Sequence, residues 1–189
     1  MKETWVAGWK DKRRVMRRYD LTSEMYEKRY RAEQQAKYAA ALENVNLAGK
    51  QVLDVGCGTG LFFSYASACA STVLGVDISR KLLLKARDEA KRLGNVSVLQ
   101  ADADHLPFNE GAFEAVFAFT VFQNMPKPRK TLGELKRITK SSGVVVVTGL
   151  KKAFPLNTFL DFLDGFSLQL AMFVDRENLN CYVAVLNAE

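Results

Sequence analysis

Residues Val52 to Gly60 read Val-Leu-Asp-Val-Gly-Cys-Gly-Thr-Gly. An apolar segment, Gln51 to Val55, runs directly into this glycine-rich turn, and a second apolar segment, Thr72 to Val76, ends at Asp77. Glycines let backbone amides approach a ligand closely, and a carboxylate at the end of the next strand can accept hydrogen bonds from ribose hydroxyls. The pattern therefore predicts a site for a cofactor that contains a nucleoside.

The spacing of the glycines separates two classes of cofactor. Dinucleotide-binding proteins place glycines at positions one, three and six of such a turn, whereas this chain has Leu61 at the sixth position, which disfavours a nicotinamide oxidoreductase. Gly56, Gly58 and Gly60, preceded by Asp54, resemble instead the first motif of class I S-adenosylmethionine-dependent methyltransferases. The chain is similar to the ubiquinone-biosynthesis-type, or methyltransferase-11-like, branch of that family over about residues 19–138.

This resemblance implies S-adenosylmethionine as the cofactor and assigns roles to several residues. Asp54 would order the glycine turn or meet the methionine ammonium, Asp77 would bind the ribose hydroxyls, and Ile78 would pack on the adenine. Asp102, in a loop that resembles the family's third motif, would accept the adenine amine, and Phe119 would face the sulfonium. The predicted cofactor-binding set is Tyr19, Tyr26, Tyr30, Asp54, Gly56, Cys57, Gly58, Gly60, Asp77, Ile78, Asp102, Ala103 and Phe119.

Tyr19, Tyr26 and Tyr30 resemble a repeated tyrosine pattern on an N-terminal helix that folds over the pocket in many relatives. An aromatic ring beside a sulfonium gains cation–π attraction. Tyrosines at helical spacing also form the apolar face of packed helices, and the sequence leaves both roles open.

Short apolar segments alternate with helical ones along most of the chain. We expect strands at 51–55, 72–76, 96–99, 115–119, 144–148, 167–173 and 181–186, and helices at 23–30, 33–43, 61–70, 79–93, 128–139 and 155–166. Alternation of this kind predicts an α/β fold, a Rossmann-like doubly wound seven-stranded sheet that is mostly parallel with an antiparallel C-terminal strand. Residues 1–48 would form a helical cap over the pocket, and residues 49–189 the methyltransferase core of a single compact domain.

The composition is that of a soluble globular protein, with 48% hydrophobic and 25% charged residues. No apolar run approaches the roughly 18 residues that cross a bilayer, and the start of the chain does not resemble a signal peptide. The three cysteines are odd in number and lack metal-ligand spacing, so we expect neither a disulfide framework nor a metal site. A cytoplasmic location fits these features.

The net charge of +6 is unevenly distributed, with +5 over residues 1–31 and +7 over residues 127–152. Such segregation favours an anionic partner such as RNA, although solvated basic surfaces give the same pattern. The core also resembles compact RNA and translation-factor methyltransferases that pair with a small activator subunit. We therefore expect tRNA, rRNA or a translation-related protein as the methyl acceptor.

No catalytic residue can be assigned from the sequence. Many relatives carry two histidines where this chain has Gln123-Asn124, and the single histidine, His105, adjoins the adenine-side loop. Methyl transfer is an in-line displacement that a protein can promote by positioning and electrostatics alone. Two alternatives remain: a small-molecule methyltransferase acting on a quinone or lipid precursor, and a non-catalytic module that binds RNA or a partner. The atom methylated and the oligomeric state stay open.

Overall fold

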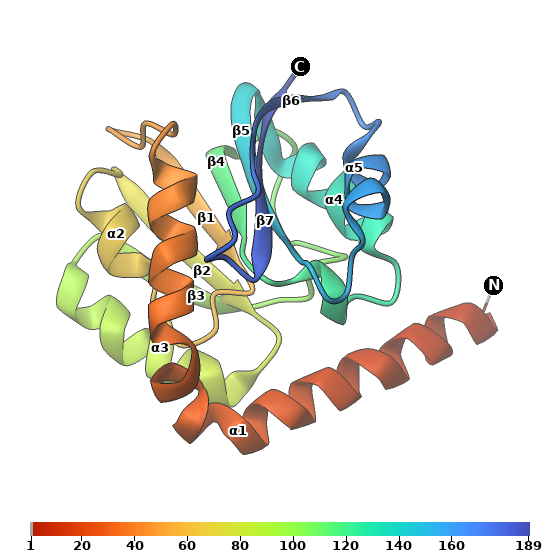
Figure 1. The fold of residues 1–189 in the computed structure, drawn as a ribbon. Coiled ribbons are helices and arrows are strands. Elements are labelled where there is room, and N and C mark those ends of the chain that lie inside the picture. Colours follow the sequence, from red (N-terminus) through yellow and green to blue (C-terminus); the bar gives the residue numbers. More distant parts are fainter. Residues whose placement is uncertain (1) are drawn as a thin grey trace.

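A computed structural model of the chain describes residues 2–189, except for the side chains of residues 2–7 and 22–30. In this part of the chain, seven strands form one sheet in the order β3-β2-β1-β4-β5-β7-β6 (Figure 1). The strands are β1 (Gln51–Val55), β2 (Thr72–Asp77), β3 (Val96–Gln100), β4 (Phe113–Ala118), β5 (Thr139–Leu150), β6 (Leu168–Val174) and β7 (Cys181–Ala188). Strand β7 runs antiparallel to both of its neighbours, and the remaining pairs are parallel. The predicted fold class is confirmed.

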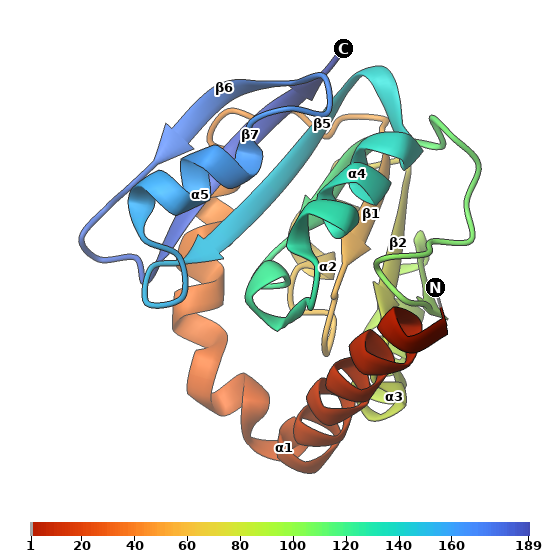
Figure 2. The same cartoon turned by 90° about the vertical axis from the view of Figure 1, so that its right-hand side faces the viewer.

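Helices cover both faces of the sheet (Figure 2). They are α1 (Lys2–Leu42), α2 (Phe63–Ser67), α3 (Arg80–Leu93), α4 (Pro128–Ile138) and α5 (Leu156–Leu163), with a short 3₁₀ helix, η1 (Phe122–Asn124). Side chains alternate across each strand, so Val52 packs in the core beneath α1, α2 and α3, whereas Leu53 packs beneath α4 and α5. The sheet is therefore buried on both faces, and its polar groups gather at the strand ends.

The helix α3 begins and ends as its sequence predicts. The Ser79 hydroxyl accepts a hydrogen bond from the Leu82 amide at 3.2 Å, which satisfies a free N–H of the first turn. At the other end Gly94 has a φ of 74°, a conformation that glycine adopts at helix C-termini without steric strain. The capping residue Ser79 also lies two residues after Asp77, so the cap places this helix start beside the predicted cofactor site.

The two N-terminal helices expected at 23–30 and 33–43 are wrong as separate elements, because both belong to α1. Ser23, expected to begin a helix, lies inside it. Between Trp9 and Ala48 the chain contains no glycine or proline, the residues that most readily end a helix. In Figure 1, α1 consists of two parts that run in different directions. Residues 2–21 belong to the first part, here called the amino-terminal arm, and the later part packs against the sheet.

Several other predicted elements differ in length from those observed, including the helix expected at 155–166, which is limited to α5. The helix expected at 61–70 is limited to the five residues of α2, because turns precede and follow it. The strand expected at 144–148 extends in both directions, since β5 pairs with β4 from Thr139 and with β7 as far as Leu150. Among the helices of the described chain, none combines the length and hydrophobicity needed to cross a bilayer.

Candidate functional site

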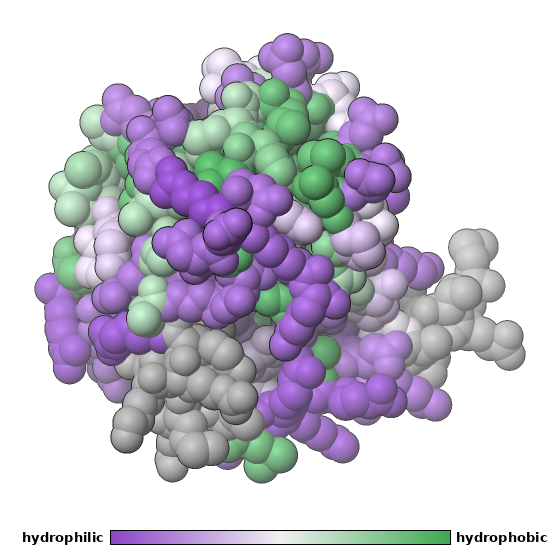
Figure 3. Space-filling view, in the orientation of Figure 1, coloured by the Kyte–Doolittle hydropathy of each residue, from purple (hydrophilic) through white to green (hydrophobic). Residues whose placement is uncertain are grey.

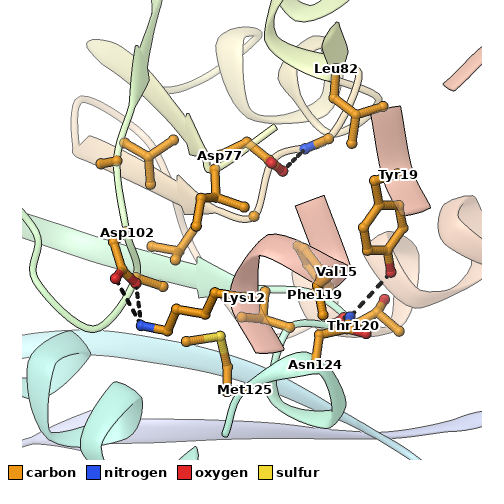
Figure 4. Close-up of a pocket in the computed structure, with 18 residues that line it drawn as sticks. Lys12, Val15, Tyr19, Asp77, Leu82, Asp102, Phe119, Thr120, Asn124 and Met125 are labelled. Carbon is orange, nitrogen blue, oxygen red and sulfur yellow. Dashed lines mark hydrogen bonds and ion pairs between the residues drawn. The ribbon is translucent and has the colours of Figure 1, made fainter. Parts of the chain in front are cut away.

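A pocket lies where the carboxyl ends of β1, β2 and β4 meet, and the amino-terminal arm closes it (Figure 4). Its cavity volume is about 90 Å³, whereas ligand sites typically measure roughly 300–1,000 Å³. The arm therefore has to shift before a nucleoside can enter. The lining residues are Lys12, Val15, Tyr19, Val55, Gly56, Gly58, Val76, Asp77, Ile78, Leu82, Ala101, Asp102, Ala103, Phe119, Thr120, Val121, Asn124 and Met125.

The glycine turn after β1 forms the floor of this pocket. Gly56, Gly58 and Gly60 have φ values of 72°, 57° and 85°, which side chains other than glycine rarely tolerate. A Cβ atom at Gly56 would also lie 2.6 Å from Cγ2 of Val121. The Gly58 amide donates to Oδ2 of Asp77 at 3.0 Å, which ties the turn to the end of β2. The floor of the pocket is therefore formed by glycine backbone, at a position where a side chain would not fit.

Asp77 lies at the pocket wall with its carboxylate held from behind. Its Oδ1 accepts a hydrogen bond from the Ser79 amide at 2.8 Å, and its Oδ2 accepts from Gly58. Burial raises the pKa of Asp77 above its ordinary value, although both backbone hydrogen bonds act in the opposite direction. The carboxylate is thus fixed in orientation, as a group that receives ligand hydroxyls should be.

Asp54 lies beneath the turn, in a smaller cavity that it shares with Gly56, Cys57, Gly58 and Phe119. Burial, with the nearby charge of Asp77 as a second cause, raises the pKa of Asp54 to about 8. A cation that entered this cavity would favour the ionised carboxylate. Burial also raises the pKa of the Cys57 thiol well above its usual range. Cys57 is therefore a packing residue of the turn rather than a nucleophile.

Asp102 lies at the other end of the pocket, but its carboxylate is already engaged. Nζ of Lys12, from the amino-terminal arm, lies 2.6 and 2.8 Å from its two oxygens and 2.5 Å from Oδ2 of Asp104. Burial alone would raise the pKa of Asp102, but the hydrogen bonds from Lys12 and the Asp104 amide outweigh it and lower the pKa. Lys12 is only 7% exposed. Lys12 carries no signal of this role in the sequence, because a lysine in a basic helix looks like a solvated one.

Further contacts hold the arm over the pocket. Oδ1 of Asp20 accepts from the Ser79 hydroxyl at 2.5 Å, at the start of α3. The Asn124 side chain in η1 accepts from Arg18 at 2.7 Å and donates to the Tyr19 hydroxyl at 3.1 Å. Tyr19 thus lies on the pocket wall.

The remaining predicted site residues fall into three groups. Ile78, Ala103 and Phe119 line the same pocket as Tyr19 and Asp77. Gly60 borders a separate surface hollow beside α3. Tyr26 and Tyr30 belong to α1, but their side chains lie outside the described residues.

The single histidine of the chain does not line the pocket. The Nε2 atom of His105 lies 2.6 Å from Nζ of Lys130 and its Nδ1 3.7 Å from Asp102. In the described part of the chain, no cluster of histidine, cysteine, aspartate or glutamate side chains could hold a metal ion, and all three cysteines are free.

Many of the basic residues that suggested an anionic partner have intramolecular partners. Hydrophilic residues dominate the face of the molecule shown in Figure 3, as expected of an ordinary solvated surface. The paired residues include Lys12 with Asp102 and Asp104, Arg129 with the carbonyls of Asp161 and Asp164, Arg137 with Glu134, Lys140 with Glu114, and Lys151 with Asp175. Such pairing reduces the charge available to a phosphate backbone.

Comparison with known proteins places this geometry in context. The family model described as methyltransferase domain matches residues 53–147. A phosphatidylethanolamine N-methyltransferase of Cereibacter sphaeroides is 34% identical over 107 residues, 55% of this chain and 52% of that protein. A demethylmenaquinone methyltransferase of Clavibacter sepedonicus is 34% identical over 101 residues, 53% of this chain and 41% of that protein. The matched region thus spans about half the length of these curated relatives or less.

Solved structures share the fold at low sequence identity. The magnesium protoporphyrin IX methyltransferase of Synechocystis, solved with bound S-adenosylmethionine, has a TM-score of 0.80 and 17% identity, covering 95% of this chain and 97% of that one. A Haloferax volcanii methyltransferase in complex with the Trm112 activator has a TM-score of 0.78 and 17% identity, covering 92% and 97%. At such identities the likeness establishes the fold alone.

Proposed function

The chain belongs to the family of methyltransferase domains, as the glycine turn predicts, and we propose that it transfers the methyl group of S-adenosylmethionine to a small quinone-like or lipid-like acceptor. The pocket at the carboxyl ends of β1, β2 and β4 carries this proposal, because it joins a glycine floor to a fixed carboxylate, Asp77. The acceptor class is supported by relatives named for phospholipid and quinone methylation. They favour it over RNA, the acceptor suggested by the charge distribution.

The residues around the pocket fit S-adenosylmethionine. At Gly56, where a Cβ would clash with Val121 of the pocket wall, the glycine turn presents bare backbone to the cofactor. Asp77 would bind the ribose hydroxyls, and the buried Asp54 would meet the methionine ammonium, a cation that offsets the burial of its charge. Asp102 and the Ala103 amide would recognise adenine once Lys12 moves aside. When bound, the cofactor supplies an activated methyl group on a positively charged sulfur.

The chain itself would promote the reaction by positioning and by excluding water. Val15, Leu82 and Met125 add an apolar wall to the pocket, which suits the ring or chain of an apolar acceptor. The amino-terminal arm, held by Lys12 and Asp20, would close over the bound molecules. A closed, dry site strengthens the electrostatic interactions inside it.

Three statements from the sequence stay predictions. These are the division into a cap of residues 1–48 and a core of residues 49–189, the cytoplasmic location, and a small activator partner. The last is supported by the neighbour solved with an activator.

Transfer of a radiolabelled methyl group tests the proposal directly. The protein would be incubated with labelled S-adenosylmethionine and a cell extract, which is then separated into solvent-extractable small molecules, RNA and protein. We expect the label in the solvent-extractable fraction, and its loss with the Asp77→Ala variant. Label confined to RNA would overturn the acceptor class, and absence of cofactor binding by calorimetry would overturn the activity.

A further inference from the structure

A buried cation lies directly behind one wall of the pocket. Lys37, in the later part of α1, is only 2% exposed. Its Nζ lies 3.1 Å from Oγ1 of Thr120 and 3.6 Å from Oε1 of Glu33. Removing an ammonium from water costs several kcal/mol unless it is well paired. Glu33 is its single close carboxylate among the described residues, so packing alone does not account for a lysine here.

The neighbouring cysteine adds no negative charge beside Lys37. Sγ of Cys181, at the start of β7, lies 3.9 Å from Nζ of Lys37 and 3.9 Å from Glu33. Burial raises the pKa of the Cys181 thiol even beside Lys37. The thiol is therefore neutral near pH 7, and Glu33 alone opposes the positive charge.

Thr120, the residue that Lys37 contacts, has an unusual backbone. Its φ of 62° is an outlier for a β-branched residue, and such a strained conformation persists only where surrounding groups hold it. Surrounding groups hold it in place: its amide donates to Oγ1 of Thr148 at 2.8 Å, and its carbonyl accepts from Gln123 at 2.5 Å and Asn124 at 3.3 Å. These hydrogen bonds fix Thr120 on the pocket wall, one residue after Phe119.

The hydrogen bond between Lys37 and Thr120 can run in one direction only. An ammonium group only donates, so Oγ1 of Thr120 accepts from Lys37 and keeps its own proton for another acceptor. Donation from a cation polarises the hydroxyl and makes it a stronger donor. The pocket wall therefore presents a donor with a positive charge behind it, close to where Phe119 would face the sulfonium.

We propose that the Lys37–Thr120 pair binds the hydroxyl oxygen of an aromatic methyl acceptor, a phenol or quinol, and favours its deprotonated form. This inference rests on the proposed function and narrows its acceptor class. The acceptor's proton leaves to solvent, so no further reactant is required. A nearby positive charge lowers the pKa of a hydroxyl but disfavours a protonated amine. The pair thus selects a ring hydroxyl over the amine of an aminolipid. In many relatives two histidines stand where this chain has Gln123-Asn124; here the charge of Lys37 would favour loss of the hydroxyl proton in place of a histidine base.

Binding of 4-nitrophenol tests the pair without any turnover, because its phenolate absorbs visible light. The probe would be titrated with pH in the presence of the protein saturated with S-adenosylhomocysteine. We expect the wild-type protein to lower the pKa of the bound probe by about one unit, the size of shift that a partly screened charge produces. Lys37→Met and Thr120→Val should each abolish the shift, whereas Lys37→Arg and Thr120→Ser should retain much of it. Lys91→Met, an exposed lysine near the end of α3, is the matched control.

A wild-type protein that leaves the probe's pKa unchanged, or a Lys37→Met variant that still lowers it, would overturn the inference. Thr120→Val keeps the test decisive if Lys37→Met fails to fold. Calorimetry with S-adenosylmethionine separates this inference from the proposed function. A protein that binds the cofactor but not the phenol contradicts only the acceptor assignment, and one that binds no cofactor contradicts the activity itself.

Discussion

The glycine turn and the amino-terminal arm face each other across one pocket, but different forces hold them. The turn connects β1 and α2, where Val55 and Val76 are buried and backbone hydrogen bonds join neighbouring strands. Among the described side chains of the arm, Lys12 and Asp20 make polar contacts with the rest of the protein, and Trp9 and Leu21 remain 40% and 81% exposed. Apolar burial provides most of the stability of a folded domain. The arm can therefore open while the floor of the pocket stays folded.

The largest loss of stability is expected from a substitution in the core of the sheet. Phe117, in β4, is fully buried and its ring packs 4.7 Å from that of Phe62. Phe117→Ala should lower the free energy of unfolding by about 3–5 kcal/mol, because it removes buried contacts and leaves a cavity. Urea denaturation followed by circular dichroism measures the change. Leu21→Ala on the exposed arm is the control, with an expected change within about 0.5 kcal/mol. Equal losses of unfolding free energy in the two variants would contradict the proposed difference between the buried sheet and the exposed arm.

Asp77→Ala should affect binding more than folding. The carboxylate would lose charge-assisted hydrogen bonds to the ribose, which are worth about 1.5–3 kcal/mol each in affinity. We expect S-adenosylmethionine to bind about 100-fold more weakly by calorimetry, with the thermal unfolding transition retained. Asp88→Ala, on the exposed side of α3, should bind as the wild type does. Unchanged affinity in Asp77→Ala would remove the ribose assignment.

The glycine turn could be predicted from the sequence, but the ion pair that holds the amino-terminal arm over the pocket could not, for a physical reason. The turn and its sheet arise from local patterns: apolar runs, glycines at fixed spacing, and a serine that caps α3. This ion pair joins Lys12 to Asp102, 90 residues away, and the sequence around neither residue indicates that the two side chains meet. The strained backbone of Thr120 and the burial of Lys37 likewise depend on the assembled fold.

Asp54→Asn should stabilise the turn while weakening cofactor binding. The folded-state pKa of Asp54 is about 8, above the ordinary value of 3.8. The folded protein therefore holds a proton that the unfolded chain loses, so wild-type stability falls as the pH rises from about 4 to about 8. Asparagine does not titrate, so the variant should be similar to the wild type near pH 4 and more stable by several kcal/mol above pH 8, since each pH unit between the two pKa values contributes up to about 1.4 kcal/mol. Urea denaturation at both pH values measures this. A variant that is less stable at pH 8 would show that the carboxylate supports the turn.

The smallest effect on overall stability is expected from Lys12→Met, which releases the arm. Removing one partner of a buried ion pair can cost about 3–5 kcal/mol when the remaining charge stays buried. Here Asp102 and Asp104 can regain water if the arm opens, so the loss cannot exceed the free energy of opening, which we expect to be about 1 kcal/mol. Hydrogen exchange should therefore accelerate about fivefold in residues 8–21, with little change in β1 and β4. Lys10→Met, an exposed lysine of the same arm, should exchange as the wild type does. If Lys12→Met instead destabilised the whole sheet by several kcal/mol, the arm would be an integral part of the core, and a cofactor could not enter by moving it aside.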